Sequence, residues 1–372
     1  NKMNILIDAT NIIPDSGGFT HLKELLKNYK TKEKEIIYVA SSNNVINKLK
    51  INNKKVRYIS NFFLNKGIFF RLVWQLFFIN LCLKHNRCSK LFVLGGYFFF
   101  IRNFKVILLI QNILPLEKKI FFEDRLILII KNYVLNILYR FSILRSDGII
   151  LLSKYSTKFL GKKKIHYKVI PHGIQKKIFR KFKKKETTDK KFKILYVSKY
   201  EKYKNQLNLV KACYALKQKN INVSLTLLGI DKDENLINSD LYKFIKKVNL
   251  KFKGLIIIKN FKKHKDLINV YPKFDLHVYS SKCEAFGLII LETIASSLPI
   301  ICSNYPVYKE ILQKNTIYFN PDDSNDIADS IKVYITDFKK KYKNTRNLFK
   351  ISKKFNWKTS SMQTFKFIKE IS

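Results

Sequence analysis

Short apolar runs alternate with helix-like segments along all 372 residues, and this alternation constrains the fold more than any other feature. In the first half the runs cover residues 5–8, 36–40, 92–94, 106–110 and 149–152. In the second half they cover 194–197, 223–229, 255–259, 274–279, 300–302 and 317–319. Strands that are apolar throughout are typical of parallel sheets covered by helices on both faces. The pattern therefore predicts an α/β protein with doubly wound sheets.

A chain of this length usually forms two domains of about 150–200 residues each. Residues 175–193 carry ten Lys or Arg against two acids and show no sustained apolar periodicity, which indicates a solvated linker. We expect one doubly wound domain over residues 1–185, a second over 186–354, and a linker at about 175–192. Open α/β sheets bind ligands at the carboxyl ends of their strands, so two facing domains would bind substrates in a cleft between them.

Glu284 and Glu292 are separated by seven residues in a segment that reads as strand, turn and helix. The apolar run 274–279 precedes them, and 288–298 has helical spacing, so Gly287 falls where the strand gives way to the helix. The free N–H groups of such a helix suit a diphosphate, and a carboxylate further along can accept hydrogen bonds from sugar or ribose hydroxyls. The alternative is one loop glutamate and one exposed helical glutamate.

This spacing resembles the E-x7-E signature of retaining GT-B glycosyltransferases, particularly glycosyltransferase family 4. Residues 275–281, 284–288 and 298–303 match the family's segment in order and spacing, except that Ser297 stands where the family usually has Gly. The resemblance implies two Rossmann-like domains facing across a cleft. Residues 355–357 resemble the start of the family's last helix, so 355–372 are expected to cross back to the N-terminal domain. The resemblance also implies a donor-binding set of Glu284, Ala285, Phe286, Gly287, Leu288 and Glu292.

A second group of implied donor-binding residues follows the strands at 194–197 and 223–229. In the family a basic residue or polar substitute lies at the first strand end, and a Lys about five residues later contacts the donor diphosphate. Lys204 is the better match, with Lys199 as its partner cation, because paired positive charges stabilise a departing nucleoside diphosphate. Chance placement is the alternative in a chain with 72 Lys and Arg. The remaining members of this group are Ser198 and Gly229.

Gly17 and Gly18 stand at the mouth of a predicted helix that runs to about residue 29. Glycine lets a backbone approach a ligand, although a simple turn explains such a pair about as well. Similar GT-B enzymes carry a glycine-rich loop near the donor at this place. We therefore assign both glycines to the donor side.

Gln111 and Asn112 open the segment 111–117, which resembles the Q-N-x-L-P-x-E stretch of a bacterial family 4 subgroup that assembles surface polysaccharides. Their amides suit hydrogen bonds to sugar hydroxyls on the acceptor side, and a polar turn closed by Pro115 is the alternative. Many family members have His near this point, so no His-dependent step carries over. His172, in a segment that resembles the family's exit from the N-terminal domain, is a further acceptor-side candidate or a structural residue.

No metal or other cofactor is expected. The five cysteines form no disulfide framework and no pairs with metal-ligand spacing. Asp231 and Asp233 spell D-x-D, which GT-B enzymes do not use, and Asp322 with Asp323 predicts a helix N-cap.

The net charge of +45 suits nucleic acid or an anionic membrane as a partner. An AT-rich coding sequence would give the same excess of Lys without a function. No RNA-binding signature appears and the lysines are spread along the chain, so we expect no nucleic-acid partner. The chain enters a strand at once, which predicts no signal peptide and a cytoplasmic location.

Two apolar segments, 67–83 and 126–144, are interrupted by Arg71 and by Lys131 with Arg140, so neither offers the ~20 apolar residues of a spanning helix. We expect soluble, core-facing helices. The aromatic and basic residues of 62–84 also suit a membrane surface, which favours peripheral contact with the inner face of the cytoplasmic membrane.

The resemblance, together with these features, implies a retaining glycosyltransferase that moves a hexosyl group from a nucleotide sugar to a growing glycan such as lipopolysaccharide, O-antigen or capsule. Lys204, Glu284 and Asn112 are the predicted catalytic residues, and the acceptor is a glycan or lipid-linked glycan. A GT-B nucleotide-sugar epimerase and a basic nucleic-acid-binding protein are the alternatives.

Overall fold

The chain folds into two compact units in this computed structural model, which describes residues 4–371 except 31–34, 50, 100–102, 123, 162–164, 181–190, 232 and 261–263. The N-terminal unit comprises Asn1–Lys118, Leu126–Gly173 and Phe355–Ser372. The C-terminal unit comprises Lys119–Arg125 and Ile174–Lys354. The boundary expected near residue 185 lies outside the described residues.

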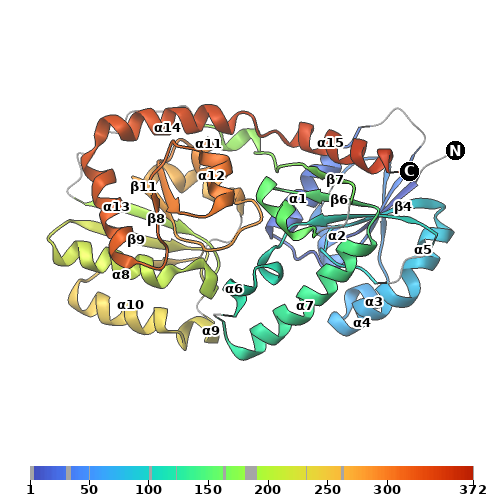
Figure 1. Ribbon diagram of the computed structural model, residues 1–372, viewed down its shortest axis with the longest axis horizontal. Helices are drawn as coiled ribbons and strands as arrows, with labels where there is room; N and C mark the ends of the chain where they lie inside the picture. Colours follow the sequence, from blue (N-terminus) through green and yellow to red (C-terminus); the bar gives the residue numbers. More distant parts are fainter. Residues whose placement is uncertain are drawn as a thin grey trace. The chain divides into compact units, whose positions relative to one another are not determined.

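The N-terminal unit (Figure 1) is built on a seven-stranded parallel sheet, in which the strand order is β3-β2-β1-β4-β5-β6-β7. Its central strands are apolar and buried because helices cover both faces. The strands are β1 (Asn4–Asp8), β2 (Ile37–Ala40), β3 (Val56–Ile59), β4 (Cys88–Val93), β5 (Lys105–Ile110), β6 (Gly148–Leu151) and β7 (Tyr167–Val169).

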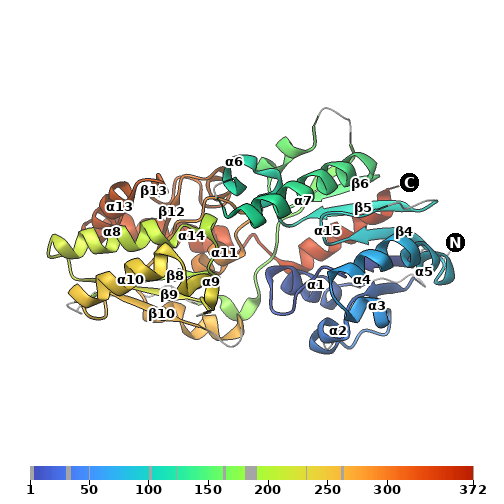
Figure 2. The ribbon, with the colours of Figure 1, turned by 90° about the horizontal axis from the view of Figure 1, so that it is seen from below.

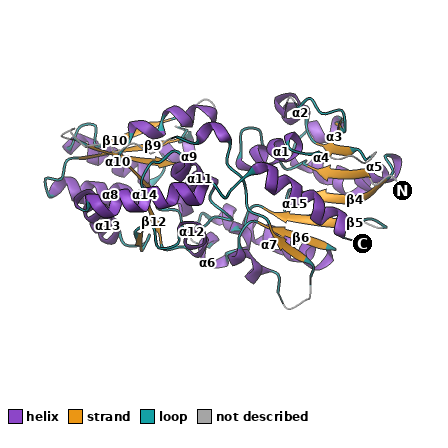
Figure 3. Ribbon diagram, turned by 90° about the horizontal axis from the view of Figure 1, so that it is seen from above, coloured by secondary structure: helices purple, strands orange, loops and turns teal. Residues whose placement is uncertain are grey.

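Helices α1 (Gly17–Lys27) and α15 (Trp357–Glu370) pack together in this unit, where the Ser361 hydroxyl donates to the Leu25 carbonyl over 2.9 Å. The Lys90 ammonium, buried beneath α15, donates to the Ile368 carbonyl over 2.8 Å. The last helix of the chain is thereby fixed to the first sheet (Figure 3). The remaining helices are α2 (Asn43–Leu49), α3 (Phe62–Asn65), α4 (Ile68–Val73), α5 (Ile79–His85) and α7 (Leu126–Arg145), with a π-helical turn at Trp74–Phe78. Helix α6 (Lys118–Phe121) begins at the last residue of an N-terminal-unit segment and continues into Lys119–Arg125 of the C-terminal unit.

Helix α7 departs from the expectation of a core-facing helix. Its buried residues are mostly polar, and its apolar residues Leu126, Ile127 and Ile130 are exposed. Among the described helices α7 alone is long and apolar enough to cross a membrane, with a mean hydropathy of 1.4, which by itself is weak evidence for a span. Phe69, exposed in the segment 67–83, shows that this segment is also not wholly core-facing.

The C-terminal unit contains a six-stranded parallel sheet with the order β10-β9-β8-β11-β12-β13 (Figure 2). One apolar core packs Leu195, Val197 and Leu228 of the sheet against Leu267 and Tyr271. The strands are β8 (Phe192–Val197), β9 (Val223–Leu228), β10 (Ile256–Lys259), β11 (Leu276–Tyr279), β12 (Ile300–Ser303) and β13 (Tyr318–Phe319). The helices are α8 (Gln206–Gln218), α9 (Glu234–Ile237), α10 (Asp240–Lys251), α11 (Leu288–Ala295), α12 (Pro306–Leu312), α13 (Ser324–Thr336) and α14 (Phe338–Ser352).

The predicted fold class, two doubly wound parallel-sheet domains, is confirmed. The predicted helix cap is also confirmed, because Asp323 precedes α13 and its carboxylate accepts from the Asn325 amide over 2.8 Å.

Candidate functional site

The C-terminal sheet reverses its strand order between β8 and β11. Ligands of open α/β sheets bind outside the carboxyl ends of the strands at such a reversal. The loop after β8 carries Lys204, and the loop after β11 carries Glu284. The two predicted catalytic residues of this unit therefore meet at the position where the topology places a ligand.

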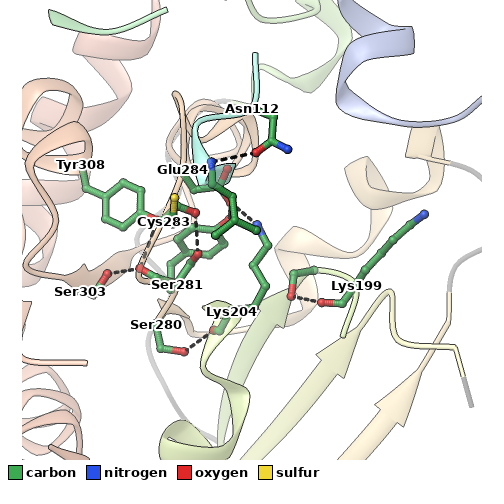
Figure 4. Close-up of polar contacts among 12 residues, drawn as sticks. Asn112, Lys199, Lys204, Ser280, Ser281, Cys283, Glu284, Ser303 and Tyr308 are labelled. Carbon is green, nitrogen blue, oxygen red and sulfur yellow. Dashed lines mark hydrogen bonds and ion pairs between the residues drawn. The ribbon is translucent and has the colours of Figure 1, made fainter. Parts of the chain in front are cut away.

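Lys204 and Glu284 form an ion pair between the ammonium and Oε1 (Figure 4). The Tyr279 hydroxyl donates to the same oxygen over 2.6 Å. Burial lowers the pKa of Lys204, but the charges of Glu284 and Glu201 outweigh this effect and hold the pKa above its usual value. Lys204 is consequently a fixed cation at neutral pH.

The backbone around Lys204 is anchored to both neighbouring strands. The Tyr196 hydroxyl of β8 donates to the Lys204 carbonyl over 2.6 Å, and the Ser280 hydroxyl, which follows β11, donates to the Asn205 carbonyl over 3.0 Å. Asn205 is in the left-handed region with φ of 58°, and its amide donates to the Pro321 carbonyl over 2.5 Å. These bonds hold the lysine in place before any ligand contacts it.

The other predicted donor residues that follow β8 and β9 are Ser198, Lys199 and Gly229. The Ser198 hydroxyl accepts from the Gln206 amide over 2.9 Å and donates to the Lys199 carbonyl over 2.8 Å. The Lys199 side chain is exposed and extends away from the Lys204–Glu284 pair in Figure 4. Gly229 directly follows β9 and is in the left-handed region, with φ of 94°. The structure thus brings Lys204, but not the Lys199 ammonium, to Glu284.

Gly287 makes the predicted junction between strand and helix. It has φ of 92° and directly precedes Leu288, the first residue of α11, and no side chain caps this helix end. A left-handed φ favours glycine, which explains the residue at this position. Ala285 and Phe286, in the loop that leads to Gly287, are buried. The predicted helix start after Gly287 is therefore present, and binding of an anion there stays a prediction.

Glu292 lies in α11 and is only 2% exposed. The Tyr271 hydroxyl donates to its Oε2 over 3.2 Å, and burial together with this carboxylate raises the pKa of Tyr271 well above its usual value. Glu292 is therefore oriented by a neutral phenol and is not an exposed helical glutamate. Its contact with a ribose stays a prediction.

Three tyrosines that support this site were missed by sequence reasoning: Tyr196, Tyr271 and Tyr279. Each places its hydroxyl on a predicted site residue, and Tyr196 and Tyr279 stack with ring centroids 5.6 Å apart. For Tyr196 and Tyr279 the available signal was a tyrosine close to the carboxyl end of each switch-point strand, whereas Tyr271 precedes β11 and had no such signal.

In the N-terminal unit the structure brings Gly18 and Gln111 together at the carboxyl edge of the sheet. A Cβ on Gly18 would lie 3.0 Å from Gln111 Oε1, whereas a Cβ on Gly17 would meet nothing within 4 Å. Close packing therefore favours glycine at 18, whereas position 17 has room for a side chain. Both residues belong to the start of α1, which Ser16 caps by accepting from the Phe19 amide over 3.1 Å.

His172 lies in a buried aromatic cluster of the same unit. Its ring centroid is 4.6 Å from that of His21 and 5.2 Å from that of Trp357. Gln111 Nε2 lies 3.1 Å from His21 Nδ1, and burial lowers the pKa of His21 to about 3, so this ring is neutral and accepts the amide proton. Burial also lowers the pKa of His172. The surroundings of His172 fit the structural alternative, and acceptor contact stays a prediction.

Asn112 is exposed, and its Oδ1 accepts from the Leu114 amide over 3.0 Å. The carbonyl oxygen of this side chain therefore closes the local turn that precedes Pro115. Its amide nitrogen remains the group with which Asn112 would contact a sugar.

Among the described residues no group of three or more His, Cys, Asp or Glu is arranged to hold a metal. Asp233 of the D-x-D pattern caps α9, because its carboxylate accepts from the Leu236 amide over 2.9 Å. Asp231 bonds to Asn260.

The two-unit architecture is that of GT-B proteins. Sucrose-phosphate synthase from Thermosynechococcus elongatus superposes with a TM-score of 0.79 at 15% identity, covering 99% of each chain. HepE from Anabaena, solved in complex with UDP and glucose, gives a TM-score of 0.72 at 18% identity, covering 99% of this chain and 100% of that one. At these identities the likeness shows the fold alone.

Residues 177–350 match the family described as Glycosyl transferases group 1, so the C-terminal half of the chain is similar to group 1 glycosyltransferases. The O-antigen chain mannosyltransferase RfbU of Salmonella typhimurium is 34% identical over 85 residues, 23% of this chain and 24% of that protein. The serotype-specific mannosyltransferase WbdA of Escherichia coli is 29% identical over 93 residues, 25% of this chain and 11% of that protein. The matched segments span about a quarter or less of these relatives.

Proposed function

We propose that this protein transfers a hexosyl group, with retention at the anomeric carbon, from a nucleotide sugar to a growing glycan such as lipopolysaccharide, O-antigen or capsule. The observation that carries the proposal is the Lys204–Glu284 pair at the switch point, beside the start of α11. The family match covers this segment, and the relatives named above are O-antigen and serotype-specific mannosyltransferases.

Leaving-group stabilisation would carry the reaction. As the bond from the anomeric carbon to the diphosphate breaks, negative charge develops on the diphosphate, and Lys204 with the first N–H groups of α11 would bind it. Glu284 would orient the sugar, and Glu292 would hold the ribose. An arriving diphosphate would compete with Glu284 for Lys204, which would release the carboxylate for the sugar hydroxyls. A glycosidase scheme needs two carboxylates that flank the anomeric carbon. Glu292 does not suit this role, because it would hold the ribose and already accepts a hydrogen bond from Tyr271.

The reaction would need no divalent cation, because Lys204 would supply the positive charge that a metal provides elsewhere. Activity should therefore persist in excess EDTA. Loss of activity in EDTA, restored by Mn²⁺, would contradict this part and direct attention to Asp231 and Asp233.

A nucleotide-sugar epimerase and a nucleic-acid-binding protein are not favoured by the family match. The test is incubation with a panel of UDP- and GDP-sugars, with and without an acceptor glycan. Nucleoside diphosphate released only with acceptor supports transfer. An epimerised nucleotide sugar formed without acceptor would overturn it.

For its location we propose the cytoplasm, at the inner face of the cytoplasmic membrane, where a lipid-linked acceptor would be accessible. The net charge of +45 supports contact with anionic lipid.

A further inference from the structure

Helix α7 presents its apolar side to solvent and its polar side to the protein. Asn132, Asn136 and Ser142 are buried. The opposite side of the helix is apolar, with exposed fractions between 50% and 73% at Leu126, Ile127, Ile130, Val134 and Ile137. A helix on the surface of a soluble protein has the reverse arrangement, so this side is built to contact something apolar.

Buried hydrogen bonds fix which side of α7 faces outward. The Asn136 amide donates to the Pro115 carbonyl over 2.6 Å, the Phe98 amide donates to the Ser142 hydroxyl over 2.9 Å, and the Tyr139 hydroxyl donates to the Gly95 carbonyl over 3.3 Å. Rotating the helix to bury its apolar side would break all three bonds. Withdrawing the helix to span a bilayer would also break them, which favours a helix that lies on a membrane.

Helices α3, α4 and α5 extend this apolar surface. Figures 1 and 2 place them on the same face of the N-terminal sheet as α7, while α15 lies on the opposite face. Exposed fractions of 60–69% occur there at Phe62, Phe69, Phe77 and Leu81. The Lys66 ammonium lies 5.3 Å from the Phe62 ring centroid, so a cation accompanies the aromatic residues.

The helices that form this surface carry charge of one sign. Residues 36–116 contain 12 Lys or Arg and no Asp or Glu, and residues 126–146 contain three Lys or Arg and no acid. A second copy of the chain would bring the same positive charge to the contact, whereas a bilayer with anionic lipids would neutralise it.

We propose that the outward side of α7, with the exposed residues of α3–α5, docks onto a bilayer that contains anionic lipid. The inference deepens the proposed membrane location and does not depend on the transfer reaction. Helix α7 would lie parallel to the bilayer with Ile130 and Ile137 below the headgroups, and Lys131 would extend to the phosphates.

The test is vesicle flotation of the full chain at physiological salt, with phosphatidylglycerol and phosphatidylcholine in equal parts or with phosphatidylcholine alone. We expect binding to the anionic vesicles. Ile130→Glu combined with Ile137→Glu should weaken that binding at least tenfold, because two buried apolar side chains become charged. Leu250→Glu, at an 88% exposed site on α10 of the C-terminal unit, should leave binding unchanged.

Thermal unfolding and UDP or GDP binding of each variant show whether the fold and the donor site are intact, so failure of docking and failure of the proposed transferase are separable. Equal vesicle binding by the wild type and the double variant would overturn the proposal. The proposal would also be overturned if the wild type is a dimer that does not bind vesicles and the double variant is a monomer. In that case a second copy of the chain covers this surface.

Discussion

Lys204 and Glu284 are 80 positions apart in the chain and form an ion pair at the carboxyl edge of the C-terminal sheet, where Tyr279 donates a further hydrogen bond to the same carboxylate oxygen. The pair joins the loop after β8 to the loop after β11. Each strand therefore contributes one charge to the switch point, and the two charges depend on each other for their position.

Lys204→Ala should lower kcat/KM by an amount equivalent to about 2–4 kcal/mol, typical for the loss of one preorganised charge donor. Lys202→Ala is the matched control, because Lys202 lies in the same 3-10 turn and is exposed. It should leave kcat/KM nearly unchanged. Steady-state kinetics of both variants decide the point, and equal losses would show that the wrong lysine has been assigned.

Glu284→Ala should mainly lower kcat, whereas Glu292→Ala should mainly raise the KM for the nucleotide sugar. The reason is that the first acid is assigned to the reacting sugar and the second to the ribose, which keeps the same contact in the ground state and the transition state. Glu292 is buried, so circular dichroism must first show that its variant is folded. Wild-type kinetics in both variants would refute the assignment.

Eleven apolar runs predicted strands, and each corresponds to a strand of the structure, but β3 and β7 were not predicted. Both are edge strands of the N-terminal sheet. β3 and β7 are only partly buried and include exposed residues such as Arg57 and Tyr167. An edge strand has one partner and a wetter face, so it lacks the continuous apolar run that marks a central strand.

The sequence indicated which residues lie on the switch-point loops but not how their side chains are held. Predicting the Tyr271–Glu292 and Tyr279–Glu284 bonds needs the register between helix, turn and strand, which residue spacing alone does not supply. Ser297 stands where the related family usually has glycine, and the structure places it in the left-handed region with φ of 59°. The sequence also did not predict that α7 exposes its apolar side, because the composition of this helix resembles that of a core helix.

Gly173→Ala should destabilise the protein by about 3 kcal/mol or more, because an added Cβ would lie 2.0 Å from the Trp357 backbone nitrogen. Gly17→Ala, where a Cβ meets nothing within 4 Å, should change the free energy of unfolding by less than about 1 kcal/mol. Thermal unfolding of the two variants provides the comparison. Similar melting temperatures would mean that Trp357 is not packed against Gly173.

Stability should fall as the pH is lowered from 7.5 to 5.0. Burial lowers the pKa of His21 and of His277 to about 3, so both are neutral in the folded protein, whereas the unfolded chain binds protons below about pH 6.5. Above about pH 6.5 the two neutral rings cost the folded state no stability. The cost to the free energy of unfolding grows as the pH falls from there toward 3. At pH 5 each costs about 2 kcal/mol.

Urea unfolding midpoints at the two pH values measure this effect, and His277→Gln should show a shallower dependence than the wild type. Identical midpoints at pH 7.5 and 5.0 would contradict burial of neutral histidines in the folded state.

The most direct measurement of the central claim is calorimetric titration of the wild type and Lys204→Ala with UDP and GDP, in EDTA. The account predicts one bound nucleotide per chain for the wild type, with at least tenfold weaker binding by Lys204→Ala at an unchanged melting temperature. If neither UDP nor GDP gives heat with the wild type, a donor-diphosphate site at the Lys204–Glu284 pair is contradicted. Equal nucleotide affinity of the wild type and Lys204→Ala would contradict it as well.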